Sequence, residues 1–294
     1  MDIEHRDKNS TPLSRAHKTR TAKVLSHIAH WSLYLLVFFL PIFFLPWTLD
    51  ILDINKQTIL VVLVLTGTLA WLGSMMFERA IFFRSGWLNL FPLLFWIAAL
   101  LSTIFSQAGY LSWIGYSSQE STSFLTITAF VIFFYLIANL AANHEVQKKL
   151  RLLLLGSSLL AGLIGALSLF GVTFLPWDFA QNQTFNTIGT INALGLYLAI
   201  TTIFALSEWT FLQKQKRFLS RAIILSLVAI SLLVLLIIDY WVLWVVLAAG
   251  VVFLFSLILL QRNLDVFYDG AVLKGIVFTV AILFIIFPTP LVIG

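Results

Sequence analysis

The chain has 294 residues, of which 60% are hydrophobic and only 11% are charged. A soluble domain of this length needs far more charge to cover its surface, so the composition excludes an ordinary soluble protein and predicts a membrane protein. The formal net charge of +5 does not indicate a nucleic-acid partner, because the cations lie in short segments between long apolar runs, where they act as topology signals. The chain has no cysteine, which excludes disulfides and thiolate metal sites.

The N-terminal segment 1–27 is polar and basic, and we expect a disordered cytoplasmic tail there. Long apolar runs follow, each near the roughly 20 residues that a membrane-crossing helix needs. Outer-membrane strands are excluded because they are shorter and alternate in character. The sequence therefore predicts an all-α, polytopic transmembrane helical bundle over 28–294. About nine spans are expected, at 28–47, 58–77, 88–106, 122–140, 152–172, 189–212, 222–238, 241–260 and 275–293.

The Lys and Arg residues predict how this bundle is oriented. All but one of the 18 fall in the tail or in the loops that alternate onto the same side of the membrane. Cytoplasmic loops carry such an excess, so we expect a cytoplasmic N-terminus, an outer C-terminus and a multi-pass protein of the bacterial inner membrane. The exception is Lys56, which lies on the outer side. The connection at Asp239 is very short and is interpreted as a turn, a kink or a re-entrant corner.

The outer segment 107–121 is rich in hydroxyl, amide and aromatic groups. Such groups contact sugars by stacking and hydrogen bonding, so Trp113, Tyr116 and Gln119 are candidate glycan contacts. The alternative interpretation is an interfacial loop with ordinary turn residues.

A second polar stretch, 181–197, leads into the sixth predicted span. Asn192 falls just inside the span, where an unpaired amide is costly. A helix that starts near Gly189, Thr190 and Gly195 can present backbone N–H groups to an anion, or can equally be a cap buried against a neighbour. No metal-ligand spacing, phosphate loop or nucleophile motif is present, so neither a metal nor a cofactor is predicted.

Four short stretches resemble the N-terminal membrane portion of the O-antigen ligase and O-antigen polymerase-like family. They are Phe-Leu-Pro-Trp-Thr at 44–48 with Asn-Lys-Gln at 55–57, Leu-Ser-Thr-Ile-Phe-Ser at 101–106 with Tyr-Leu-Ser-Trp-Ile-Gly at 110–115, Gly-Thr-Ile-Asn-Ala-Leu-Gly at 189–195, and Asp-Tyr-Trp-Val-Leu-Trp at 239–244. The resemblance implies a glycosyltransferase that moves a glycan from undecaprenyl diphosphate to an acceptor at the outer face of the inner membrane, without a metal. Outward Arg residues and a His in a large outer loop would assist the reaction.

The chain departs from that family pattern in two places. Asp239-Tyr-Trp stands where many relatives carry Ser-Arg-Gly, and the sequence ends at Gly294, where the large outer loop would begin. Lys56 is then the only outward cation for a diphosphate, so we expect an incomplete catalytic set and a chain that is part of a longer enzyme. The alternatives are a non-catalytic membrane subunit that works with glycan-assembly proteins, and a transporter.

Overall fold

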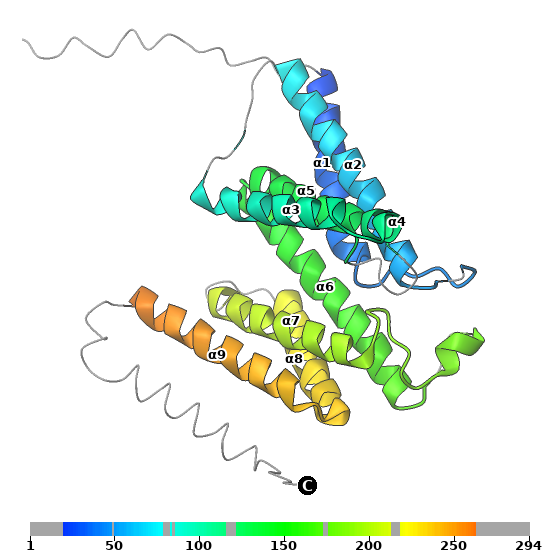
Figure 1. Ribbon diagram of the computed structural model, residues 1–294. Coiled ribbons are helices and arrows are strands. Elements are labelled where there is room, and N and C mark those ends of the chain that lie inside the picture. Colours follow the sequence, from blue (N-terminus) through cyan, green and yellow to red (C-terminus); the bar gives the residue numbers. More distant parts are fainter. Residues whose placement is uncertain are drawn as a thin grey trace, which may run out of the picture. The chain divides into compact units, whose positions relative to one another are not determined.

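The structure is a computed structural model that describes residues 20–48, 50–78, 83, 86–115, 122–172, 176–212 and 218–262. Every regular element in these ranges is a helix, which confirms the all-α class (Figure 1). Six of the helices are long and apolar enough to cross a membrane, and two shorter apolar helices accompany them. A multi-pass membrane protein follows from this, because a lipid-exposed helix satisfies its own backbone hydrogen bonds. The predicted span 275–293 lies outside the described residues, and the count of about nine spans stays a prediction.

The chain divides into two compact units, Met1–Leu153 and Leu154–Gly294. Helix α6 (His144–Leu169) begins in the first unit and continues into the second. The first unit also contains α1 (Arg20–Phe39), α2 (Asp53–Glu78), the short 3₁₀ helix η1 (Trp87–Asn89), α3 (Leu90–Ile104), α4 (Gly109–Ile114) and α5 (Phe124–Leu140).

Helices α1 and α2 form a closely packed pair in the first unit (Figure 1). A Cβ atom on Gly67 would lie 3.3 Å from Cβ of Ser32, and one on Gly73 would lie 3.2 Å from Cδ1 of Leu25. Ser32 and the neighbouring Ala29 are buried. Small residues therefore face one another along this pair, which is how helices approach closely where lipid removes the hydrophobic drive for association.

Helix α5 lies between α2 and α3. Leu136 of α5 packs near Gly67 of α2, at 3.4 Å from the position of a Cβ on that glycine. On the other side, Trp96 Nε1 of α3 donates to Thr128 Oγ1 at 3.0 Å, and the Tyr135 hydroxyl donates to the Asn89 carbonyl at 2.7 Å. Thr103 is the only fully buried residue of α3, and most of the apolar side chains of this helix are exposed.

The second unit contains η3 (Asp178–Gln181), α7 (Ile191–Leu212), α8 (Phe218–Ile238) and α9 (Trp241–Arg262) with the remainder of α6. Helix α7 packs against both α8 and α9 (Figure 1). Fully buried leucines build its core, with Leu198 on α7, Leu227 and Leu235 on α8 and Leu243 on α9. The apolar faces of three helices thus converge on one another.

Several helices begin before the predicted spans. Helix α1 begins at Arg20, inside the segment expected to be a disordered tail, and α6 begins at His144 instead of 152. Helix α2 begins at Asp53, so Lys56 lies in its first turn instead of a loop. Hydropathy locates the apolar part of a span, whereas Lys, Arg, Glu and Gln are good helix formers that extend a helix beyond it.

The corner at Asp239 is a true break between two helices. Helix α8 ends at Ile238 and α9 begins at Trp241, as the sequence predicted. Asp239 has φ +48°, in the left-handed region that Asp and Asn tolerate better than other non-glycine residues. The two helices are therefore separate and do not form one kinked helix, and whether the corner is re-entrant stays a prediction.

Candidate functional site

The loop before α2 is folded back onto the first turn of that helix by Asn55. Its side chain is only 4% exposed, and Nδ2 donates to Thr48 Oγ1 at 2.7 Å, the Asp50 carbonyl at 3.0 Å and the Ile51 carbonyl at 2.9 Å. Asp50 caps the helix, because its Oδ1 accepts from Asp53 N at 2.9 Å. We call Thr48, Asp50, Ile51 and Asn55 the Asn55 loop.

A second set of hydrogen bonds joins α2 to α4 and α5. Gln57 Nε2 lies 3.0 Å from each of three acceptors, the Ile114 carbonyl, Ser123 Oγ and Thr126 Oγ1. Ser123 also caps α5, since its Oγ accepts from Thr126 N at 3.3 Å. We call Gln57, Ile114, Ser123 and Thr126 the Gln57 cluster. It gathers the ends of three helices at one place.

Lys56 lies between these two polar groups. Its neighbours Asn55 and Gln57 are each held by three hydrogen bonds, and Lys56 itself is half-buried. Asp53 lies one helical turn before it, at a spacing that lets opposite charges interact. The backbone that carries the lysine is therefore fixed on both sides.

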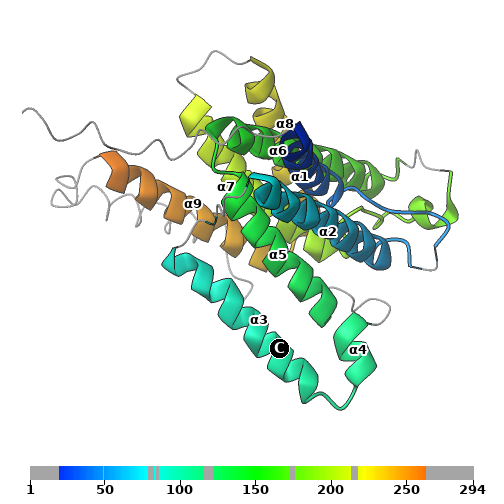
Figure 2. The same cartoon turned by 90° about the horizontal axis from the view of Figure 1, so that it is seen from above.

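Trp113 belongs to the same end of the first unit. It lies on α4 directly before Ile114, whose carbonyl accepts from Gln57. Its ring meets Phe124 edge to face with 5.0 Å between centroids, and its side chain remains 45% exposed. Figure 2 shows α4 beside the beginning of α5. The structure thus brings the elements of Lys56 and Trp113 together, while Tyr116 and Gln119 lie outside the described residues.

The other predicted site residues lie in the second unit, around the start of α7. Asn186 shapes the preceding turn, because its Oδ1 accepts from Ile188 N and Gly189 N, each at 2.9 Å. Gly189 has φ +145°, which a side chain would strain. Thr190 caps α7 by accepting from Ala193 N at 3.2 Å. Hydrogen bonds among neighbouring residues of the chain therefore explain why α7 begins here.

Asn192 and Gly195 differ in their surroundings although both lie in the first turns of α7. Asn192 is exposed. Gly195 is buried, and a Cβ atom there would overlap Leu243 and lie 3.2 Å from Cδ1 of Ile238. The glycine therefore allows α7 to approach α8 and α9, and of the pair only Asn192 is accessible to a ligand.

Sequence reasoning gave Asn55 and Gln57 no role beyond flanking Lys56 in a motif, and missed Ser123, Thr126 and Asn186. Asn186 had a readable signal, because an Asn side chain often accepts from the backbone N–H two residues further on and so forms a turn. Ser123 had one too, since Ser is favoured at a helix N-terminus. Within the described residues, no group of three or more His, Asp or Glu side chains is placed to hold a metal ion.

The two sets of residues are separate candidates, one in each unit, and the set around Lys56 is the richer in charge and hydrogen-bonding groups. The chemistry it offers is a half-buried cation on a hydrogen-bonded helix start, with hydroxyl, amide and indole groups on the elements joined to that helix. Comparison with models of known protein families, with characterised proteins and with solved structures finds no match for this chain.

Proposed function

We propose that this chain is an O-antigen ligase-like membrane protein that binds a glycan linked to undecaprenyl diphosphate at the outer face of the inner membrane. The observation that carries the proposal is the position of Lys56, in the first turn of α2 between the Asn55 loop and the Gln57 cluster. The motif resemblance and the bias of the other cations toward the opposite side support the same assignment.

A diphosphate needs charge-assisted hydrogen bonds, and a lysine ammonium supplies up to three donors. Lys56 suits this role because its neighbours hold the helix start in place. Because Asn55 and Gln57 fix the turn on either side, little ordering of the backbone remains to be done when the anion binds. A half-buried cation also acts in a medium of lower dielectric than water, which strengthens its attraction for the phosphates.

Trp113 is the proposed sugar contact. Its indole is held by Phe124 at one edge and is 45% exposed, so a surface remains for a sugar ring to pack on. Indole also carries an N–H donor for a sugar hydroxyl. The connection of α4 to α2 through Gln57 places this aromatic side chain on the same scaffold as Lys56.

The proposal concerns binding and positioning of the lipid-linked glycan, and not a complete catalytic set. A leaving diphosphate carries about two negative charges, and neutralising such charge is usually the largest catalytic contribution. Lys56 supplies one positive charge, so transfer to the acceptor requires further groups from elsewhere. Both a transferase with additional parts and a non-catalytic subunit of a glycan-assembly system are compatible with this role.

Native mass spectrometry of the purified protein with undecaprenyl diphosphate tests the proposal. We expect Lys56→Gln to weaken binding roughly 10- to 100-fold, the worth of one hydrogen-bonded charge pair, and Lys56→Arg to retain most of it. Lys149→Gln, a cation on α6, is the matched control and should bind as the unmodified protein does. Equal affinity of the Lys56→Gln variant and the unmodified protein would contradict the proposal.

Trp113→Ala separates recognition of the glycan from recognition of the carrier. Binding of the glycan-linked carrier should fall several-fold, whereas binding of bare undecaprenyl diphosphate should not change. A matched loss for both ligands would show that Trp113 supports the fold of the site and does not contact sugar. A transfer assay with an added acceptor then decides between the transferase and the non-catalytic subunit.

A further inference from the structure

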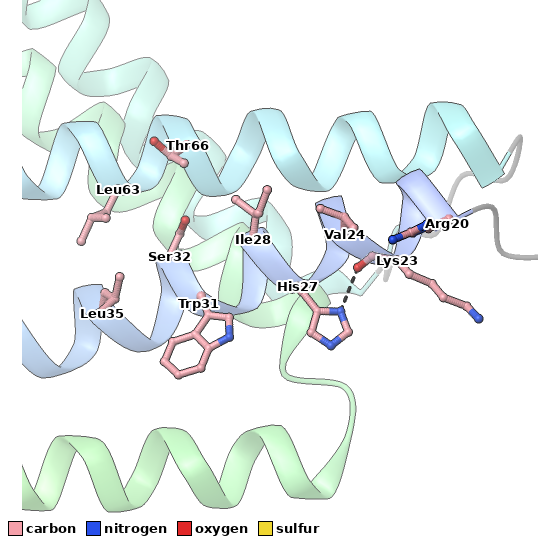
Figure 3. Close-up of a pocket in the computed structure, with 10 residues that line it drawn as sticks. All are labelled: Arg20, Lys23, Val24, His27, Ile28, Trp31, Ser32, Leu35, Leu63 and Thr66. Atoms are coloured by element: carbon pink, nitrogen blue, oxygen red, sulfur yellow. Dashed lines mark hydrogen bonds between the residues drawn. The ribbon is translucent and has the colours of Figure 1, made fainter.

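A groove runs along the outside of the α1–α2 pair in the first unit, and its first α2 residue, Leu63, follows Lys56 by about two helical turns. It has a volume of about 520 Å³, within the range of small-ligand sites. Its apolar lining comes from Val24, Ile28, Trp31 and Leu35 of α1 and from Leu63 of α2, with Ser32 and Thr66 beside them. Figure 3 shows these side chains extending along the two helices.

The charged side chains gather at one end of this groove. Arg20 and Lys23 lie in the first turn of α1, and both are exposed (Figure 3). His27 follows one turn later, with Nδ1 donating to the Lys23 carbonyl at 2.8 Å. Beyond His27 the lining is apolar except for the hydroxyl groups of Ser32 and Thr66. The groove therefore has two cations at its mouth and hydrocarbon along its length.

We propose that this groove binds one anionic phospholipid from the leaflet at the α1 N-terminus. The phosphate lies against Arg20 and Lys23, and an acyl chain lies along Ile28, Leu35 and Leu63. Charge complementarity argues for this occupant, because basic pockets between membrane helices take anionic head groups. A second protein helix would bury the two cations instead of pairing them, at a considerable desolvation cost.

The exposure of the lining fits a lipid tail. Val24 is 53% exposed, Ile28 41% and Trp31 61%, on a helix whose opposite face is buried through Ala29, Leu33 and Leu36. Trp31, in the middle of α1, adds an exposed aromatic side chain to the apolar surface along this length.

Titration of the full-length protein in detergent with phosphatidylglycerol and with phosphatidylcholine of the same acyl chains, followed by native mass spectrometry, tests this site. Phosphatidylglycerol should bind more tightly. The double substitution Arg20→Gln and Lys23→Gln should remove the preference, with a loss of roughly 30-fold if each cation contributes as basic residues near a membrane surface do. Equal binding of the two lipids, or unchanged binding by the double variant, overturns the proposal.

Lys149→Gln is the control for charge alone. Lys149 lines a neighbouring hollow of about 260 Å³ that shares His27 and Trp31 with the groove, and its Nζ lies 5.9 Å from the centre of the Tyr34 ring. We expect this variant to keep its preference for phosphatidylglycerol. A loss as large as that of the double variant overturns the groove, because the lipid would then be responding to general positive charge.

The acyl chain has its own test. Thr66→Trp fills the groove from α2 and leaves Arg20 and Lys23 in place, so phosphatidylglycerol binding should fall although the charge is intact. Val24→Trp does the same from the exposed face of α1, should the first variant not fold. Unchanged binding by the folded variants overturns the groove assignment, as does competition by free glycerol phosphate at concentrations near those of the lipid. Lys56→Gln, which tests the proposed function, should leave this site unaffected.

Discussion

The two units differ in the contacts that stand out between their helices. In the first unit, side-chain hydrogen bonds join helix ends and loops, as with Asn55, Gln57 and Tyr135. In the second, glycines on one helix receive large aliphatic side chains from another. These pairs are Gly165 with Leu194, Gly195 with Leu243 and Gly250 with Ile203.

This difference indicates where a ligand can be accommodated. Packing and interhelical hydrogen bonds are the forces that associate helices in lipid. Both units use close packing at glycines, which in the first unit are Gly67 and Gly73, but the first unit adds side-chain hydrogen bonds that join its helix ends. At these three glycines of the second unit, the space beside the backbone is filled by Leu194, Leu243 and Ile203. The polar helix ends of the first unit leave Lys56 and Trp113 partly accessible on a fixed scaffold. The first unit is therefore the better place to look for binding, and the second for stability.

The largest expected effect is on the packing of the second unit. Gly195→Val places a branched side chain against Leu243 and Ile238, and should lower the free energy of unfolding by about 3 kcal/mol, at the upper end for overpacking. Equilibrium unfolding of the bicelle-reconstituted protein in sodium dodecyl sulfate, followed by circular dichroism, measures this.

Gly156→Val is the matched control. Gly156 is also within a helix, α6, but a Cβ atom there meets nothing within 4 Å. We expect a change of less than about 1 kcal/mol, the scale of helix propensity. If the two substitutions destabilise the protein equally, close packing does not distinguish Gly195 from Gly156. The contrast between the units would then lose its main support.

A middle-sized effect is expected for the Asn55 loop. Asn55→Leu removes three hydrogen bonds from a buried side chain, and should cost about 2 kcal/mol, the typical penalty for leaving buried polar groups without a partner. The same variant should also weaken binding of undecaprenyl diphosphate, because the turn that carries Lys56 is no longer fixed.

Thr58→Val is the comparison for that loop. Thr58 is an exposed residue of the same helix that donates only to the Ile54 carbonyl at 2.8 Å, one turn back. Loss of this local bond should leave both unfolding and ligand binding nearly unchanged. If Asn55→Leu clearly lowers stability but leaves ligand binding unchanged, the Asn55 loop supports the fold and is not needed by the binding site.

Sequence alone predicted the long helices of both units, but neither the short helix α4 nor the way in which each unit is held. Apolar length located α2, α7 and the break at Asp239, since these depend on local composition. It did not reveal that Asn55 turns back onto its own loop, because a polar residue at a span end can face water, head groups or protein. Gly195 illustrates the same limit, since a glycine can admit a ligand or a neighbouring helix, and only the presence of Leu243 decides between them.

The smallest expected effects come from one tyrosine hydroxyl in each unit. Tyr197 bonds Ser158 at 2.7 Å, and Ser158 also donates to the Leu154 carbonyl at 2.7 Å, so the tyrosine is the donor of the pair. Tyr197→Phe leaves the serine satisfied and should cost about 0.5 kcal/mol, near the average for interhelical hydrogen bonds in membranes.

Tyr135→Phe should cost more, about 1 kcal/mol, because it removes the bond that ties α5 to the Asn89 carbonyl just before α3. Helix α3 has little other burial to hold it, whereas Tyr197 lies on a helix already packed against α8 and α9. Unfolding measurements on the two variants show which of them loses more stability. A larger loss of stability for Tyr197→Phe would mean that the second unit depends more on side-chain hydrogen bonds than the first. The start of α7 would then be the better candidate for a binding site.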